Sequence, residues 1–162
     1  MDGGISMEQW TVVLTTTAIV LAAVVFHYEA LSMLNRWACR RMHTSAPGHR
    51  RHYTLLIIMF GLLIAHVLEI WLFAVGHWAL AESASGAYGS VVGYDEFLFL
   101  DYVYFSVTNY TTVGWGDLHA SGPLRFLAGT ESLAGLMMIT WSASFTYLIM
   151  SRTWRGIEDL ED

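Results

Sequence analysis

Charged residues are scarce in this chain of 162 residues, and lysine is absent altogether. Charged side chains make up 14% of the sequence and hydrophobic ones 55%, and the mean hydropathy is +0.45. A soluble domain of this length normally carries far more charge, so the composition predicts a single-domain membrane protein. The net charge of −6 argues against general binding of nucleic acid.

Cysteine is almost missing as well. Cys39 is the single cysteine, which excludes an intrachain disulfide, and no neighbouring residue gives it a metal-ligand spacing. No apolar run carries arginine at every third position, which excludes a voltage-sensing helix within this sequence. These absences leave the apolar runs and the few polar residues inside them as the informative features.

Three apolar runs are long enough to cross a bilayer. They extend from Trp10 to Phe26 and on towards Leu34, from Tyr53 to Ala81, and from Phe126 to Met150. Each reaches the ~20 residues that ~30 Å of hydrocarbon requires. The run from 97 to 112 is shorter and contains Asp101, which favours a re-entrant half-helix. We therefore predict an all-α membrane protein with three transmembrane helices, a re-entrant helix and a loop.

The predicted boundaries follow from these runs. An extra N-terminal transmembrane helix occupies 1–34, a basic loop 35–52, a second region 53–150, and a short tail 151–162. The second region divides into an outer helix at 53–81, a re-entrant helix at 97–111, a loop at 112–117 and an inner helix at 124–150.

Arginine placement predicts the orientation. Five arginines lie in the loop 35–52, and Arg152 and Arg155 follow the last span. Positive residues favour the cytoplasmic side, so we expect the N-terminus outside and the C-terminus in the cytoplasm. The protein is then a multi-pass protein of the plasma membrane, or of the cell inner membrane in a bacterium. The re-entrant segment enters from outside.

The loop 112–117 reads T-V-G-W-G-D and combines alternating glycines with membrane depth. Glycine adopts backbone conformations that a Cβ disfavours, so successive carbonyls are able to face one way. Irregular backbone inside a membrane is tolerated where protein buries it or where it lines a water-filled path. The pattern favours a row of carbonyls lining a pore. The alternative is a tight glycine turn.

The residues around this loop carry a family resemblance. The stretch from Thr111 to Leu118 resembles the selectivity filter of the potassium-channel pore family, whose usual core is T-V-G-Y-G. The likeness continues upstream through Tyr104–Thr108 and downstream from Arg125 to Gly135, and covers about 53–150. We call residues 112–117 the filter loop and the preceding helix the pore helix.

The resemblance implies passive conduction of K⁺ through backbone carbonyls, with no enzymatic activity and no cofactor besides the permeant ion. The implied filter residues are Thr112, Val113, Gly114, Trp115 and Gly116, with K⁺ at the first four. One filter stretch per chain implies four copies around one axis, a homotetramer in membrane lipid. The alternatives are a weakly selective cation channel and a non-conducting scaffold or accessory subunit.

Trp115 departs from the family pattern, which usually has tyrosine at this position. An indole only donates hydrogen bonds. We therefore expect Trp115 to donate to Tyr104 or Thr108 of the pore helix. The expected filter support on that helix consists of Tyr104, Phe105 and Thr108.

Two carboxylates, Glu69 and Glu131, lie inside spans at the predicted depth of the pore helix. Ionisable residues in a membrane usually face protein or water. We expect both to support the filter by hydrogen bonds to that scaffold, through Tyr110, Asn109 or Trp115. A metal at His66-x-x-Glu69 and simple polar contacts between helices are the alternatives. A membrane metalloenzyme would also recruit His27, Glu29 and His77, but His27 and His77 are expected near opposite faces.

Acidic residues surround the expected filter mouth. Asp117 and His119 are the mouth candidates, and Asp101 suits the positive N-terminal end of the pore helix. For Glu82, Asp95 and Glu96 an ordinary solvated loop is the simpler interpretation. Four copies of His119 would gain charge as pH falls and lower cation conductance; an exposed loop histidine without function is the alternative.

The inner helix carries the last candidates. Gly135 falls where the family has a hinge glycine, although close packing explains a glycine equally well. Ile139, Ala143 and Tyr147 follow at four-residue steps, so we expect them to line the cavity and lower gate.

Overall fold

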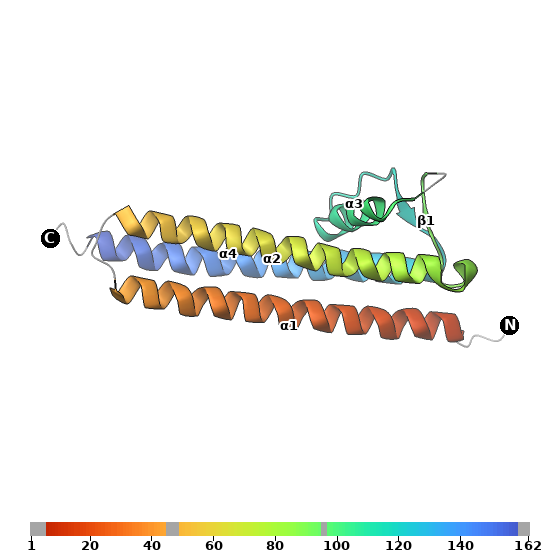
Figure 1. Ribbon diagram of the computed structural model, residues 1–162, viewed down its shortest axis with the longest axis horizontal. Coiled ribbons are helices and arrows are strands. Elements are labelled where there is room, and N and C mark those ends of the chain that lie inside the picture. The colour runs from red at the N-terminus through yellow and green to blue at the C-terminus, as the bar shows by residue number, and fades with distance from the viewer. Residues whose placement is uncertain (1–5, 45–48, 95–96, 159–162) are drawn as a thin grey trace. The chain divides into compact units, whose positions relative to one another are not determined.

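The computed structural model describes residues 6–44, 49–94 and 97–158, and most of them are helical (Figure 1). The long helices are α1 (Met7–Thr44), α2 (His49–Glu82) and α4 (Arg125–Glu158), and α3 (Phe99–Tyr110) is short. Two single-turn 3₁₀ helices are present: η1 (Ser83–Gly86) precedes the outer loop, which joins η1 to α3, and η2 (Gly122–Leu124) follows the filter loop and precedes α4. Strands β1 (Val91–Val92) and β2 (His119–Ala120) complete the chain.

Within the described residues, three helices are long and apolar enough to cross a membrane, over Met7–Arg41, Tyr53–Glu82 and Gly122–Arg152. Together with the short α3 they confirm the predicted all-α membrane fold. Hydrocarbon offers no water to the backbone N–H and C=O groups. A continuous helix pairs all of them within one segment, so each apolar run is helical throughout.

The long helices extend beyond their predicted ends. The first was expected to stop at 34 but α1 continues to Thr44, and α2 begins at His49. The prediction of a loop over 35–52 is therefore wrong, because residues 35–44 and 49–52 are helical. Residues 45–48 lie outside the described residues. The physical reason is that 7–44 contains no glycine or proline, and arginine, alanine and methionine favour helix. Likewise α4 does not end at 150 but continues to Glu158, which covers the first part of the predicted tail 151–162; residues 159–162 lie outside the described residues.

The helix α3 is two residues shorter at its start and one at its end than the predicted 97–111. Its first turn is stabilised by Asp101, whose Oδ2 accepts a hydrogen bond from the Leu98 amide at 2.7 Å. A carboxylate there also complements the positive end of the helix dipole, as expected from sequence. At the other end the Thr111 amide donates to the Val107 carbonyl at 3.1 Å.

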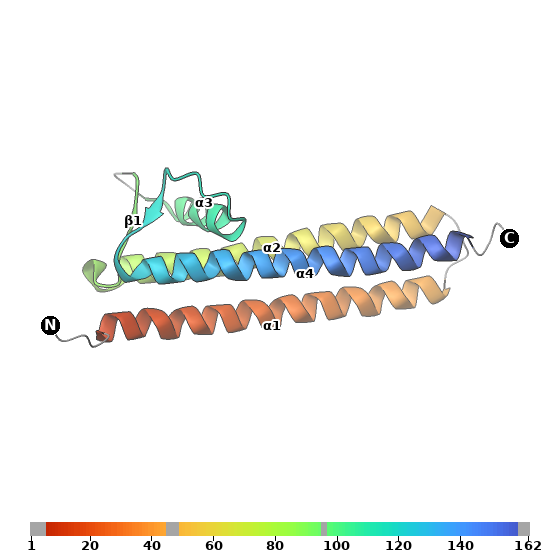
Figure 2. The same cartoon turned by 180° about the vertical axis from the view of Figure 1, so that it is seen from behind.

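The chain divides into two compact units. Unit 1 comprises Met1–Val24 and Leu68–Met137, and unit 2 comprises Val25–Val67 and Met138–Asp162. Within unit 1, α3 lies on one side of the α2 and α4 segments, and the α1 segment lies on the other (Figures 1 and 2). The filter loop, which follows α3, is thus separated from α1 by α2 and α4.

A two-stranded antiparallel sheet holds the outer loop of unit 1. Val91 pairs with Ala120 and Val92 with His119, so the loop before α3 is joined to the segment after the filter. Gly93, at φ +149°, packs so closely that a Cβ would lie 2.3 Å from the Asp117 carbonyl oxygen. The outer loop therefore braces the end of the filter loop.

Unit 2 has an apolar core of its own between α1, α2 and α4. Its buried members are Leu31, Leu34, Ala38, Ile58, Leu62 and Ile149. At Gly61 a Cβ would lie 2.8 Å from a methyl group of Leu34, so the two helices approach closely there. Small residues permit such approaches between membrane helices.

Candidate functional site

The filter loop has an alternating backbone. Thr112, Gly114 and Gly116 have positive φ angles of 59°, 51° and 83°, whereas the residues between them do not. In an ordinary strand successive carbonyls point to opposite sides, and an alternation in the sign of φ cancels that reversal. A positive φ on Thr112 costs ~1–3 kcal/mol and persists where the surroundings impose it. The loop is therefore a strained element held by its anchors.

The anchors come from the C-terminal end of α3. The Thr112 amide donates to the Asn109 carbonyl at 2.9 Å, and the Gly114 amide donates to the Thr108 carbonyl at 3.1 Å. Nothing lies within 4 Å of a Cβ built on Gly114 or Gly116. Both glycines are thus needed for their backbone conformation, and space is not the constraint. Residues 111–117 are all exposed in the single chain.

Tyr104 connects the pore helix to the filter mouth. Its hydroxyl donates to Oδ2 of Asp117 at 2.9 Å. This hydrogen bond is the main reason that the pKa of Tyr104 is raised, with burial and the Asp117 charge adding to it. The contact gives Asp117 a defined position just beyond the last filter glycine.

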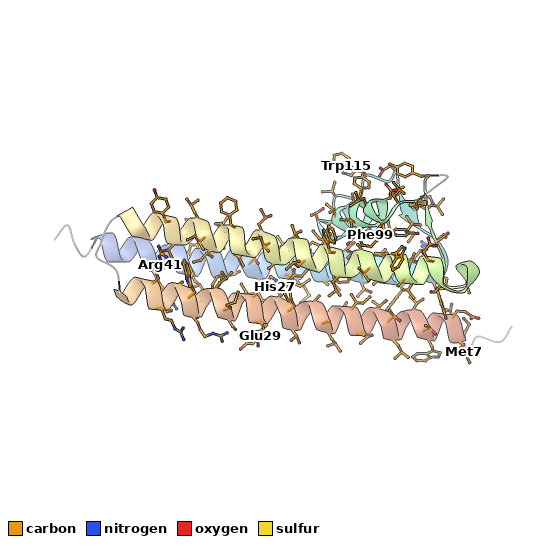
Figure 3. All side chains as sticks on the ribbon, in the orientation of Figure 1. Met7, His27, Glu29, Arg41, Phe99 and Trp115 are labelled. Atoms are coloured by element: carbon orange, nitrogen blue, oxygen red, sulfur yellow. The ribbon has the colours of Figure 1, made fainter. Side chains whose placement is uncertain are left out.

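Trp115 does not make the contact predicted from sequence. Its side chain is 74% exposed and points away from the helices of unit 1 (Figure 3), and among the described residues it donates no hydrogen bond. The Thr108 hydroxyl donates instead to the Phe105 carbonyl at 2.9 Å. Within one chain the predicted donation to Tyr104 or Thr108 is therefore wrong, because the loop carries the indole outward.

Phe105 is buried in unit 1, with its ring edge-on to His77 at a centroid distance of 5.0 Å. It thus packs behind the pore helix, on the side of α2. This position agrees with a supporting role, although the contact partner is an imidazole that sequence reasoning did not connect with it.

Glu69 makes the predicted hydrogen bond to the pore helix. The Tyr110 hydroxyl donates to its Oε2 at 2.5 Å, and both side chains are buried. Tyr110 is the last residue of α3, so this bond ties the end of the pore helix to the middle of α2. The Tyr110 ring also packs on Phe73, at a centroid distance of 6.3 Å.

Glu131 joins α4 to both α2 and α3. Its Oε2 lies 2.8 Å from Nε2 of His77, and its Oε1 is hydrogen-bonded to the Ser106 hydroxyl. The Ser106 hydroxyl also donates to the Ile70 carbonyl at 2.8 Å. Sequence reasoning predicted a contact from Glu131 to the pore helix but missed both Ser106 and His77. The sequence did contain a signal for His77. Glu69, Phe73 and His77 are spaced four residues apart and therefore lie on the same face of α2.

The number of donor protons available in this network indicates that both Glu131 and His77 are neutral. A hydroxyl has one proton, and Ser106 must donate it to the Ile70 carbonyl, which only accepts. The contact with Glu131 then needs a proton from the carboxyl group. His77 completes the network by donating from Nε2 to Glu131, which leaves Nδ1 as an acceptor. That Nδ1 is the buried ring atom that finds no partner in the described part of the chain.

The alternative, a charged pair, fits less well. It would place a proton on Nδ1 of His77 as a buried donor without an acceptor, which costs more than a bare lone pair. We therefore assign a protonated Glu131 and a neutral His77 that carries its proton on Nε2.

One further contact joins the end of α2 to α3. The Tyr102 hydroxyl donates to Glu82 at 3.2 Å, so Glu82 is more than the solvated residue expected from sequence. Burial, followed by this hydrogen bond, raises the pKa of Tyr102 to about 12. His119 is exposed in β2 and pairs through its backbone with Val92. Asp95 and Glu96 lie outside the described residues.

Gly135 packs directly against the pore helix. A Cβ at this position would lie 2.2 Å from the Tyr110 carbonyl oxygen, and α4 is a continuous helix through it. The sequence offered a hinge and close packing as interpretations of Gly135. The contact with Tyr110 supports close packing. A hinge role stays a prediction.

Unit 2 holds the other inner-helix candidates. Ile139, Ala143 and Tyr147 are all exposed in the single chain, and Tyr147 is 71% exposed. A neighbouring face of α4 carries the buried Ser142, whose Oγ lies 3.0 Å from Nε2 of His66 and 3.3 Å from Nε2 of His27. His27 points towards α2 and α4 whereas Glu29 points away (Figure 3). A polar cluster thus connects all three helices of unit 2.

The comparison with known families adds independent information. A family model described as "Ion channel" matches residues 52–152, which is well over half of the chain. Neither the curated proteins nor the solved structures contain a significant match. The matched range includes α3, the filter loop and most of α2 and α4. The chain therefore belongs to the ion channel family.

Proposed function

We propose that this chain is one subunit of a homotetrameric potassium channel, which conducts K⁺ passively through the backbone carbonyls of residues 112–116. The observation that carries the proposal is the alternation of positive φ at Thr112, Gly114 and Gly116. Such a backbone can present successive carbonyl oxygens to one path, and rings of carbonyls replace the hydration shell of an ion. The K⁺ sites would lie at Thr112, Val113, Gly114 and Trp115.

Exposure of the filter loop supports assembly into a tetramer. Val113 is 52% exposed and Trp115 is 74% exposed, although their loop is anchored at membrane depth in our topology. One strand cannot surround an ion, and each chain has one such loop. Three further copies around a closed axis would complete the path and cover these apolar side chains.

The surroundings of the loop favour a cation. The C-terminal end of α3 carries the negative end of a helix dipole, and in our topology it points to the membrane centre. Asp117 stands after the last filter glycine, where a carboxylate raises the local concentration of cations. With the N-terminus outside and the C-terminus in the cytoplasm of a plasma membrane, this mouth faces the exterior.

Two buried carboxyl groups support the filter from behind in this proposal. Glu69 holds the end of α3 through Tyr110, and Glu131 holds its middle through Ser106. Because the filter loop is anchored on the Thr108 and Asn109 carbonyls, fixing α3 also fixes the loop. Ile139, Ala143 and Tyr147 would line the cavity below.

Flux measurements test the proposal. The purified protein is reconstituted into liposomes with a K⁺ gradient, and fluxes of K⁺, Rb⁺, Na⁺ and Cs⁺ are compared with and without Ba²⁺. We expect K⁺ and Rb⁺ to pass well ahead of Na⁺ and Ba²⁺ to block. Gly116→Ala is the matched control: a Cβ there meets nothing within 4 Å, but φ +83° strains an alanine. It should fold and lose selective flux.

The remaining outcomes separate the alternatives. Equal K⁺ and Na⁺ flux would indicate a weakly selective cation channel, and absence of all flux would indicate a scaffold or accessory subunit. Trp115→Phe tests the unusual filter residue: we expect weaker K⁺ preference or weaker tetramers, and an unchanged tetramer with unchanged selectivity would contradict a role for the indole. Native mass spectrometry gives the number of chains in each case.

His119 offers a test of the mouth itself. The side chain is exposed, and protonation of four copies would place positive charge at the mouth. We expect inward cation flux to fall at acidic external pH. If His119→Ala retains the whole pH response, His119 has no part in it.

A further inference from the structure

A groove runs along unit 2 between α1 and α4. Its volume is about 250 Å³. The α1 side contributes Tyr28, Leu31, Ser32 and Asn35, and the α4 side runs from Trp141 to Arg152. From Trp141 to Arg152 the helix rises by eleven steps of ~1.5 Å, which makes the groove ~16 Å long. The groove is narrow, and in size it fits a single extended chain better than a compact ligand.

The two ends of the groove differ in chemistry. Tyr28 and Trp141 form one end, with ring centroids 6.4 Å apart, and Leu31, Phe145 and Leu148 continue the apolar wall. Asn35 and Arg152 form the other end. A molecule that is apolar over most of its length and anionic at one end matches this arrangement.

Among the described residues, no carboxylate neutralises the charge at the polar end. Arg152 is exposed, and in the described part of the chain no carboxylate pairs with it. Among the described side chains of unit 2, Glu29 is the single carboxylate, and it points away from α2 and α4 (Figure 3). Four arginines oppose it: Arg36, Arg40, Arg41 and Arg152. A second copy that presented this same groove would bring its own Arg152 against this one and is therefore disfavoured as the occupant.

We propose that this groove is a binding site for one anionic phospholipid, with an acyl chain along Leu31 and Phe145 and the phosphate at Arg152 and Asn35. Both helices lie in candidate membrane spans, so lipid has direct access to the groove. Basic pockets between membrane helices bind anionic headgroups in this manner. The site does not depend on which ion the chain conducts, and it gives α1 a role as one wall of a lipid site.

Native mass spectrometry of the full-length protein in detergent tests the site. The delipidated protein is titrated with dioleoylphosphatidylglycerol or dioleoylphosphatidylcholine, and the bound fractions are compared. We expect tighter binding of phosphatidylglycerol. Arg152→Gln should reduce that preference about five-fold, the effect of one basic side chain on an anionic lipid. Arg40→Gln is the control, because Arg40 is an exposed arginine outside the groove.

A second variant separates the groove from its charge. Ser32→Phe fills the groove without changing any charge, and should abolish labelling of α4 by a phosphatidylglycerol with a photoreactive acyl chain. Equal loss of preference in Arg152→Gln and Arg40→Gln would overturn the proposal in favour of non-specific surface charge. Unchanged labelling in Ser32→Phe, or cross-links from Trp141–Arg152 to a neighbouring copy, would overturn it as well. Flux measurements on the same variants show whether conduction survives, so a failed lipid site remains distinguishable from a failed channel.

Discussion

Replacement of Glu131 tests the assignment of a protonated carboxyl group behind the pore helix. Glutamine has the same shape, its carbonyl accepts from Nε2 of His77, and its amide donates to the Ser106 oxygen. If Glu131 is protonated in the wild type, Glu131→Gln reproduces every hydrogen bond of the network. We therefore expect it to change the free energy of unfolding by less than about 1 kcal/mol.

Glu131→Ala should be far more damaging. It removes both contacts and leaves the buried Nε2–H of His77 without an acceptor, which costs ~1–3 kcal/mol. It also leaves a cavity between three helices, where truncation of a large buried side chain costs ~2–5 kcal/mol. Because the two effects overlap, we expect a total of about 3–5 kcal/mol, or roughly 10 °C in melting temperature.

The melting temperature of both variants is measured in detergent by following tryptophan fluorescence during heating. Glu29→Gln serves as the control, since Glu29 is exposed and its replacement should leave the melting temperature unchanged. Equal destabilisation by Glu131→Gln and Glu131→Ala would refute the neutral assignment, because it would mean that a negative charge on Glu131 holds a protonated His77.

Two further predictions concern the pore helix. Gly135→Ala places a Cβ 2.2 Å from the Tyr110 carbonyl oxygen, so it should lower the free energy of unfolding by ~1–3 kcal/mol and disturb conduction. Gly129 has open space around it, and Gly129→Ala should stabilise α4 by ~0.5–1 kcal/mol. The same melting experiment measures both variants. A similar loss in both variants would contradict the packing role. The Tyr104–Asp117 bond, which raises the Tyr104 pKa, should be intact below the ordinary tyrosine pKa of about 10 and be lost as pH rises through the higher value. The K⁺/Na⁺ flux ratio should then change at alkaline pH in the wild type, and a Tyr104→Phe channel that shows the same transition would rule out this origin.

The membrane fold was largely predictable because hydropathy and run length are local properties. The three spans and the short α3 follow from apolar runs of the expected lengths. Helix ends were predicted less well. They depend on where helix-forming residues stop, and in α1 arginine continues the helix after the apolar run has ended.

The filter loop was also visible in the sequence, since alternating glycines demand alternating backbone conformations. The positive φ of Thr112 was not visible, because a threonine adopts it when surrounding hydrogen bonds impose it. The outward direction of the Trp115 side chain was not visible either, because the path of the loop decides it. From the residue type we predicted an indole that faces the pore helix and donates a hydrogen bond to it.

By itself the sequence determined that this protein spans a membrane, where the loop with alternating glycines lies and that two carboxyl groups sit at the depth of α3. The tertiary structure alone decided what those groups bind. Glu131 reaches His77 and Ser106 across 54 and 25 positions, and Glu69 reaches Tyr110 across 41. Helical periodicity says which residues share a face of one helix. It does not say which residue of another helix that face meets, because packing at a given depth depends on every helix at once.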